Sequence, residues 1–216
     1  MRKYKYILFD LDGTLIRSHP GIFSCIRHAL SVMGRPQPTE EELRKCVGPS
    51  LVYSFSNFFG MSQADAERAT AIYREQYAKT GVYENHPFEG VQETLKGLQE
   101  HGYILALATS KPQVFADVIT QRFGLNEYLT VRVGCGLDGS LPTKASVIAE
   151  AVKRLGAEKA DCLMIGDRRQ DAMGAKEVGV DCALLKLGYA EEGEIEECEP
   201  AFVFNDFADL SAFLTE

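Results

Sequence analysis

The sequence lacks any apolar run that approaches the roughly 20 residues required to span a membrane, so no transmembrane helix is predicted. It also has no cluster of basic residues, and its formal net charge is −8. These absences argue against nucleic acid and against a membrane surface as main partners. A signal peptide is not expected, because Arg2, Lys3 and Lys5 lead directly into a predicted strand that ends at Asp10.

Cysteine is present, but without a recognisable pattern. The six cysteines are widely spaced, with no CxxC pair and no Cys/His spacing of the kind that binds zinc. Four of them stand beside apolar residues, which predicts buried free thiols. We therefore expect a reduced protein with a cytoplasmic location.

Internal repeats and low-complexity segments are absent as well. The 216 residues suit one α/β domain, or a core domain that carries a smaller insertion. A hydrophobic content of 45% is enough to build a packed core. The composition is that of an ordinary globular protein.

The most informative stretch is residues 7–14, with the sequence Ile-Leu-Phe-Asp-Leu-Asp-Gly-Thr. Its apolar start predicts a buried strand. Because side chains alternate along a strand, Asp10 and Asp12 can point the same way, with Leu11 turned into the protein. Two acids side by side at a strand end are costly unless a cation or a proton offsets them. The pair therefore indicates a site that does chemistry.

The region that follows the first strand predicts helices rather than strands. Apolar periodicity, helix caps and terminal glycines predict helices over 21–33, 39–47, 51–59 and 62–80. The second of them opens with a capping box formed by Thr39 and Glu42. These helices form a predicted insertion over 17–85.

From residue 86 onward, predicted helices and strands alternate. Helices are expected at 91–100, 112–123, 143–155 and 170–178, and strands at 103–109, 130–133, 161–167, 181–187 and 201–204. This alternation predicts right-handed crossovers and a mostly parallel sheet with helices on both faces. The predicted organisation is an α/β core of residues 1–16 and 86–216, interrupted by the helical insertion 17–85.

Polar residues stand at the carboxyl ends of three predicted strands. Asp10 and Asp12 end the first strand, Thr109 and Ser110 follow another, and Asp167 ends a third, with Asp171 four residues further on. Each group alone is ordinary, since such residues often only form turns or cap helices. Ligands of open parallel sheets bind beyond the carboxyl ends of the strands, so the three groups together predict one site.

These segments resemble the haloacid dehalogenase-like hydrolases, in their phosphatase branch. The resemblance covers about residues 5–190 and rests on four segments in order: Asp10 to Thr14, Thr109-Ser110, Lys144, and Gly166 to Asp171. Many relatives carry Lys-Pro at the third segment, whereas Ala145 follows Lys144 here. Lys153 or Lys159 could serve instead, but Lys144 fits best because it stands in the first turn of a helix at the expected edge of the site. The resemblance implies a Rossmann-like core with an inserted helical cap.

The resemblance also implies roles for individual residues. Asp10 is the expected nucleophile, and Asp12 is the expected general acid and base. Thr109, Ser110 and Lys144 are expected to bind the phosphoryl group. Retention of an acid at Asp12 favours oxygen–phosphorus chemistry, because the dehalogenases of this fold need no proton donor there.

A magnesium ion is the implied cofactor. Asp10, the backbone carbonyl of Asp12, and Asp167 are expected to hold it, with Asp171 as a further acid that ligates the ion or lies behind its ligands. Two unit negative charges about 4 Å apart repel by roughly 4 kcal/mol at an effective dielectric constant near 20. Several carboxylates and a phosphate dianion therefore need a divalent cation to assemble.

Substrate-selecting residues are expected in two places. Gly48, Pro49 and Ser50 resemble the specificity loop of the cap, although the stretch could also be a plain connection between helices. Lys111 could reach a second anionic group on the substrate, or it could be a solvated lysine.

The sequence thus predicts a magnesium-dependent phosphatase that acts on a small phosphorylated metabolite, similar to 5'-nucleotidases or phosphoglycolate phosphatases. A monomer or a homodimer is expected, with no nucleic acid partner. Three alternatives stay open: a phosphosugar mutase of the same fold, inorganic pyrophosphatase activity, and a catalytically silent binding module.

Overall fold

A computed structural model describes residues 4–215 of the chain. The chain forms two compact units. One holds the residues up to Ile16 and from Pro87 onward, and the other is Arg17–His86. The insertion predicted from the sequence, 17–85, ends one residue before the second unit does.

The first unit is built on a six-stranded sheet with the order β5-β4-β1-β6-β7-β8, in which neighbouring strands pair in parallel. The predicted α/β fold is confirmed. The strands are β1 (Tyr6–Phe9), β4 (Ile104–Pro112), β5 (Leu129–Cys135), β6 (Cys162–Gly166), β7 (Asp181–Leu185) and β8 (Phe202–Phe204).

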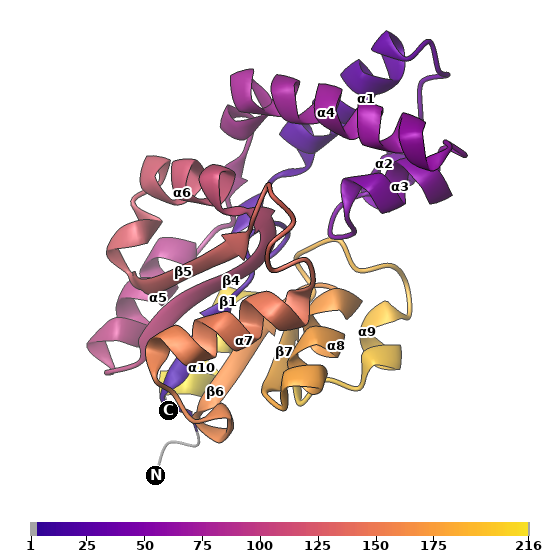
Figure 1. The fold of residues 1–216 in the computed structure, drawn as a ribbon. Helices are drawn as coiled ribbons and strands as arrows, with labels where there is room; N and C mark the ends of the chain where they lie inside the picture. Colours follow the sequence, from indigo (N-terminus) through magenta and orange to yellow (C-terminus); the bar gives the residue numbers. More distant parts are fainter. Residues whose placement is uncertain (1–3, 216) are drawn as a thin grey trace. The chain divides into compact units, whose positions relative to one another are not determined.

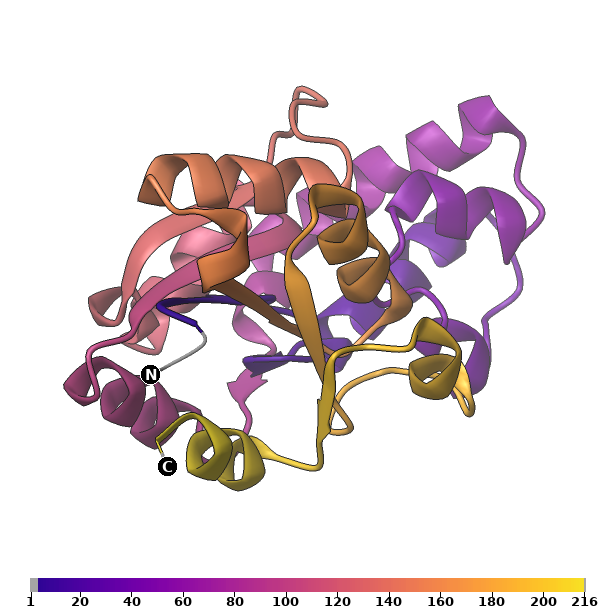
Figure 2. The same cartoon turned by 90° about the horizontal axis from the view of Figure 1, so that it is seen from below.

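Helices cover both faces of this sheet (Figures 1 and 2). Helices α7 and α8 pack on one face, and α5 and α10 lie on the other. The helices of this unit are α5 (Val91–Glu100), α6 (Gln113–Arg122), α7 (Lys144–Leu155), α8 (Arg169–Val178), α9 (Glu194–Cys198) and α10 (Phe207–Thr215). Two short 3-10 turns, η2 (Leu125–Glu127) and η3 (Lys159–Asp161), complete it.

Strand β1 is buried along its whole length, as its apolar sequence predicts. Leu8 faces the hydrophobic cluster that α7 and α8 form with the sheet, together with Ala106 of β4 and Met164 of β6. Because strand side chains alternate, Ile7 and Phe9 point to the opposite face, and both are fully buried. The site residues that follow β1 therefore start from a strand fixed on both faces.

Several elements differ from the sequence-based expectations. Strand β4 runs on to Pro112, past the predicted end at Thr109, and its pairing with β5 is irregular there. Helices α9 and α10 were not predicted, and neither were the two-residue strands β2 (Ile16–Arg17) and β3 (His86–Pro87), which pair where the chain passes between the units. Such short elements depend on tertiary contacts rather than on periodicity.

The second unit is helical. Its elements are α1 (His19–Val32), α2 (Glu40–Arg44), α3 (Leu51–Asn57), α4 (Gln63–Lys79) and the 3-10 turn η1 (Gly81–Tyr83). The predicted capping box is present, because Thr39 Oγ1 accepts from the Glu42 backbone N–H and the Glu42 carboxylate accepts from the Thr39 N–H. The four predicted helices of the insertion are confirmed to within a few residues.

Cysteines and membrane character can be compared with expectation over the described residues. All six cysteines are free, and Cys25, Cys46, Cys162 and Cys182 are buried, as predicted. Within residues 4–215, no helix combines the length and the apolar character of a membrane span.

Candidate active site

The strand order explains how residues far apart in sequence meet. Strands β4 and β6 flank β1 on its two sides, and all three run parallel. Their carboxyl ends therefore lie at one edge of the sheet and bring Asp10, Thr109 and Asp167 to the same region. Oxygen atoms of Asp10, Asp167 and Asp171 lie within 4.8 Å of one another.

A tight turn carries the chain from Asp10 past the site. The Leu11 carbonyl accepts from the N–H groups of Leu15 and Ile16, and the Gly13 N–H donates to the Ile16 carbonyl. Gly13 has a φ of +85°, which is strained for any side chain, and a Cβ there would lie 2.3 Å from Asp167 Oδ2. The glycine therefore lets the turn pass directly against the Asp167 carboxylate.

Asp167 is fully buried, and its two oxygens have separate partners. Its Oδ2 accepts from the Tyr189 backbone N–H at 2.7 Å, and its Oδ1 accepts from the Thr14 hydroxyl at 3.2 Å. Burial, and then the nearby carboxylates of Asp171 and Asp10, raise the pKa of Asp167 well above its ordinary value. An ionised Asp167 therefore needs more positive charge than its neighbours supply.

Lys144 joins two of the carboxylates. Its Nζ lies 2.7 Å from Asp10 Oδ1 and 2.7 Å from Asp171 Oδ1, and the lysine side chain is 5% exposed. Burial acts to lower the pKa of Lys144, but the carboxylates of Asp10 and Asp171 outweigh it, and the pKa is raised. The lysine is held as a cation at the start of α7, where Thr143 caps the helix by accepting from the Ser146 N–H.

The alternatives to Lys144 lie elsewhere. Lys153 has an 80% exposed side chain that pairs with Glu150 at 3.6 Å, and Lys159 is exposed. Lys144, in contrast, contacts Asp10 directly. The geometry therefore favours Lys144 for the phosphate-binding role, even though no proline follows it.

Asp171 uses both of its oxygens. Its Oδ1 pairs with Lys144, and its Oδ2 accepts from the backbone N–H groups of Asp167 and Arg168 at 3.1 and 3.0 Å. Burial raises the pKa of Asp171, while Lys144 works in the opposite direction. This arrangement suits an acid that holds Lys144 and the Asp167 loop better than it suits a direct metal ligand.

The donor set fits a divalent cation with oxygen preference. Three carboxylates and one ammonium group leave two negative charges uncompensated in a largely buried cluster. Magnesium prefers oxygen ligands and is commonly bound by one or two carboxylates together with substrate phosphate. Asp10 and Asp167 are the residues that would hold such an ion. The side chain of Asp12 is not part of this cluster.

Thr109 and Ser110 lie at the end of β4 in contrasting environments. Thr109 is 1% exposed, and its Oγ1 accepts from the Lys111 backbone N–H at 3.2 Å, so its hydroxyl proton remains available for a phosphoryl oxygen. Ser110 is exposed, and its carbonyl accepts from Cys135 Sγ at 2.9 Å. The phosphate-binding roles of both residues stay predictions.

Lys111 is neither solvated nor directed at bulk water. Its Nζ lies 2.9 Å from both carboxylate oxygens of Asp12, and the side chains of Lys111 and Asp12 are 5% and 17% exposed. The structure thus pairs the residue expected to act as general acid with a buried cation.

The loop expected to select substrate lies in the second unit. Gly48 and Pro49 connect α2 to α3, and Ser50 caps α3 by accepting from the Tyr53 N–H at 3.3 Å. A specificity role for Gly48, Pro49 and Ser50 stays a prediction.

Sequence reasoning missed the residues that hold the Asp167 loop. Glu194, at the start of α9, accepts from Arg168 Nε at 2.9 Å and from the Arg169 N–H at 2.7 Å. Glu194 and Arg168 are both 7% exposed, so this is a buried pair. The stretch around Glu194 is so rich in glutamate that it resembles a solvated surface, and no spacing marks one member as buried.

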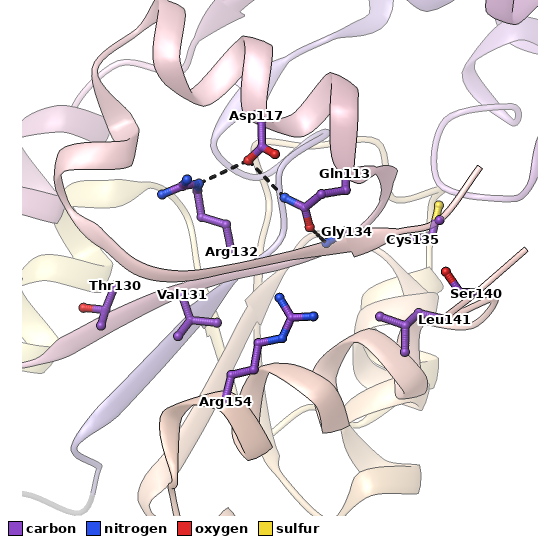
Figure 3. A pocket seen from close by; sticks show the side chains of 11 residues that line it. Gln113, Asp117, Thr130, Val131, Arg132, Gly134, Cys135, Ser140, Leu141 and Arg154 are labelled. Atoms are coloured by element: carbon purple, nitrogen blue, oxygen red, sulfur yellow. Dashed lines mark hydrogen bonds and ion pairs between the residues drawn. The ribbon is translucent and has the colours of Figure 1, made fainter. Parts of the chain in front are cut away.

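A pocket of about 500 Å³ lies between α6, β5 and α7 (Figure 3). Asp117 accepts from Arg132 Nε and from Gln113 Nε2, while Gln113 Oε1 accepts from the Gly134 N–H at 2.6 Å. None of the clustered carboxylates lines this pocket. It is separate from the candidate active site, but it borders the irregular end of β4 and β5.

Comparisons with known proteins show the family to which the chain belongs. A profile described as haloacid dehalogenase-like hydrolase matches residues 7–185. The chain is 37% identical over 212 residues to a 5'-nucleotidase from Pseudomonas aeruginosa, covering 98% of this chain and 96% of that protein. It is 34% identical over 197 residues to the tyrosine-protein kinase PtkA of Mycobacterium tuberculosis, covering 91% and 67%. The crystal structure of a predicted phosphatase from Clostridium acetobutylicum superposes with a TM-score of 0.93 at 33% identity, covering 98% of both chains.

The chain therefore belongs to the haloacid dehalogenase-like hydrolases. Within that family it is a phosphatase, an enzyme that hydrolyses phosphoric monoesters.

Proposed function

We propose that the protein is a magnesium-dependent phosphatase of small phosphorylated metabolites that works through an aspartyl-phosphate on Asp10. The observation that carries the proposal is the cluster of Asp10, Asp167 and Asp171 within 4.8 Å, with Lys144 paired to Asp10 at 2.7 Å. A divalent ion and Lys144 together would stabilise this group of carboxylates. An oxygen of Asp10 could then attack the phosphorus atom of a substrate.

In the first step, an oxygen of Asp10 attacks phosphorus while the bond between phosphorus and the leaving-group oxygen breaks. Asp12 donates its proton to that leaving-group oxygen and becomes a carboxylate. Lys144 and the Thr109 hydroxyl hold the phosphoryl oxygens, and a bound magnesium ion would offset their charge. The step replaces one difficult hydrolysis by two easier reactions.

In the second step, water attacks the phosphorus of the aspartyl-phosphate and the bond to Asp10 breaks. Asp12, now a carboxylate, takes the proton from the water. Inorganic phosphate leaves, and both aspartates return to their starting state. Asp12 thus alternates between acid and base.

Nucleoside 5'-monophosphates are the substrate class that the comparisons favour. The relative from Pseudomonas aeruginosa named 5'-nucleotidase is similar over nearly the whole length of both chains. The helical unit Arg17–His86 interrupts the chain directly after the Asp10 turn, which supports a role for it as a substrate-selecting cap. Phosphoglycolate is the competing small substrate from the sequence resemblance.

The experiment is a phosphate-release screen with purified protein. Nucleoside monophosphates, phosphoglycolate, sugar phosphates and pyrophosphate are each supplied with magnesium and, in parallel, with excess chelator. Free phosphate from nucleoside monophosphates, lost with the chelator and in Asp10→Asn, is the expected result. Appreciable turnover by Asp10→Asn, with its fold intact, would remove Asp10 as the nucleophile.

Two alternative reactions would also pass through a phosphorylated Asp10, and they differ from hydrolysis in the group that receives the phosphoryl group. The relative PtkA carries the name of a tyrosine-protein kinase, so transfer from the phosphorylated site to a tyrosine hydroxyl is a second candidate. A phosphosugar mutase would instead return the phosphoryl group to a sugar. Rapid release of free phosphate from a generic aryl phosphate would count against both.

A further inference from the structure

Lys111 and Asp12 form a close ion pair at the edge of the sheet. Lys111 Nζ lies 2.9 Å from Asp12 Oδ1 and 2.9 Å from Asp12 Oδ2. Contact with both oxygens fixes the plane of the carboxyl group more firmly than contact with one. The lysine side chain is 5% exposed, so water competes little for either partner.

An irregularity in the sheet brings Lys111 to this position. Thr109 pairs with Gly134, but the next pair in the register is Pro112 with Cys135, so two residues of β4 have no partner between them. The Lys111 N–H turns back to Thr109 Oγ1 at 3.2 Å. An irregularity of this kind re-aims side chains that a regular strand would send elsewhere.

Strand β5 has a glycine, Gly134, where the irregular part of β4 passes closest to it. A Cβ on Gly134 would lie 2.6 Å from the Lys111 carbonyl oxygen and 2.8 Å from the backbone of Gln113. Gln113 also accepts from the Gly134 N–H at 2.6 Å. The absence of a side chain at Gly134 lets the backbone of Lys111 and Gln113 lie against β5, and the hydrogen bond between Gly134 and the Gln113 side chain holds it there.

Stability alone is a poor explanation for the pair. A buried ion pair pays a large desolvation cost, and hydrophobic residues of similar volume often serve stability equally well. Lys144 Nζ contacts Asp10, and Lys111 Nζ contacts both oxygens of Asp12. The site thus contains two buried lysines that contact different carboxylates, which indicates different tasks.

We propose that Lys111 is the positioning residue of Asp12. Its ammonium group orients the Asp12 carboxyl group toward the leaving-group oxygen and offsets the charge left when Asp12 gives up its proton. The inference rests on the proposed acid–base role of Asp12. It assigns Lys111 to the leaving-group side of the reaction rather than to recognition of a second anionic group on the substrate.

Leaving groups of different basicity separate these two roles. A 4-nitrophenolate ion departs without a proton, whereas an alkoxide needs one from Asp12. Loss of a residue that acts through Asp12 therefore harms hydrolysis of an alkyl phosphate more than hydrolysis of 4-nitrophenyl phosphate. Loss of a residue that binds the phosphoryl group harms both alike.

The test compares kcat/KM for the two substrates in Lys111→Met, in Asp12→Asn and in the matched surface control Lys96→Met, all with magnesium. Since general acid catalysis contributes about 10²–10⁴-fold, Lys111→Met is expected to lose at least about tenfold more activity on the alkyl phosphate than on 4-nitrophenyl phosphate. The selective loss should appear in kcat/KM, which reports the step in which the leaving group departs, because the later hydrolysis of the aspartyl-phosphate is the same for both substrates. Lys96, exposed on α5, is expected to tolerate the change.

Equal losses on the two substrates would overturn the assignment of Lys111. If Asp12→Asn shows the selective loss and Lys111→Met does not, only this inference fails. If Asp12→Asn itself shows no selectivity, the acid–base role of Asp12 fails and the inference falls with it.

A double variant keeps the test valid if Lys111→Met folds poorly beside an unpaired Asp12. Lys111→Met in the Asp12→Asn background leaves two neutral side chains. Because Lys111 acts through Asp12, the second change is expected to cost less than threefold in alkyl phosphate hydrolysis beyond Asp12→Asn. A further loss of tenfold or more on both substrates would show direct contact with the substrate and contradict the proposal.

Discussion

At the scale of single residues, Lys144 shows how position outweighs a local motif. The sequence has three lysines that could fill the third segment of the resemblance, and the expected proline is missing after Lys144. The structure buries Lys144 against Asp10 and leaves Lys153 at the surface. The first turn of α7 places Lys144 beside Asp10, as its helix position suggested, and its phosphate-binding role stays a prediction.

Replacement of Lys144 by methionine is expected to reduce kcat by about 10²–10³-fold, the range typical of losing one preorganised charge at a developing anion. Lys153→Met is the matched control and is expected to keep wild-type kcat. Steady-state phosphate release measures both. Equal activities for the two variants would remove Lys144 from the site chemistry.

The contact of Lys111 with Asp12 could not be predicted from the sequence. The sequence left Lys111 open between a substrate contact and a solvated lysine, and the structure instead pairs it with Asp12. The register irregularity between β4 and β5 that turns it inward has no signature in the order of residues. The position of Thr109, two residues earlier, could be expected because its pairing with Gly134 still continues the regular part of the strand.

At the scale of elements, long periodic segments were predictable and short ones were not. Helix α5 matches its predicted range, 91–100, because apolar spacing and a terminal glycine mark it. Helix α9 has five residues and no periodicity, yet its Glu194 holds the loop that carries Asp167. Its role comes from burial against Arg168, a contact 26 residues away in the chain.

Ionisation of Glu194 is expected to make the stability of the protein depend on pH. Burial acts to raise the pKa of Glu194, but the Arg168 side chain and the backbone N–H groups outweigh it, and the pKa lies below the ordinary 4.5. A carboxyl group whose pKa is lowered by folding stabilises the protein above its unfolded pKa and loses that contribution as pH falls. We expect Glu194→Gln to cost about 2 kcal/mol near pH 7, the worth of a charge-assisted hydrogen bond.

Thermal unfolding of wild type and Glu194→Gln between pH 7 and pH 3.5 measures the contribution of ionised Glu194 to stability. The midpoint difference is expected to be on the order of 5 °C at pH 7 and to shrink as the pH falls below about 4.5. A difference that stays constant over this range would show that ionisation of Glu194 contributes nothing.

At the scale of the whole molecule, the alternation of strands and helices predicted a parallel α/β sheet but not its strand order. The structure places β4, β1 and β6 side by side, and so the acids of two strands meet. A shared site could be predicted without the strand order, because ligands of open parallel sheets bind at the edge where the strands end. What could not be predicted was the division of hydrogen bonds among Asp167, Asp171 and their backbone donors, which depends on packing.

The stability of the whole protein is expected to depend on the metal through Asp167. Burial and the neighbouring Asp171 and Asp10 raise the pKa of Asp167, so its ionised form is disfavoured in the folded protein. At neutral pH the metal-free protein therefore carries a cost that is absent in the unfolded chain. Asparagine fits the same partners, with its oxygen toward the Tyr189 N–H and its amide toward Thr14.

Asp167→Asn is expected to unfold at the same or a higher temperature than wild type in excess chelator. Magnesium at about 100 times its Kd should stabilise wild type by roughly 2.7 kcal/mol and leave the variant nearly unchanged. Asp161→Asn, at an exposed position, serves as the control and should respond to magnesium as wild type does. A magnesium shift in Asp167→Asn equal to that of wild type would place the ion elsewhere.

The most direct measurement is a crystal structure of the protein with magnesium and beryllofluoride, which mimics a phosphoryl group on a carboxylate. We expect beryllofluoride bonded to an oxygen of Asp10, with Lys144 beside it and magnesium between Asp10 and Asp167. Beryllofluoride on any other side chain, or magnesium out of reach of Asp167, would contradict the account.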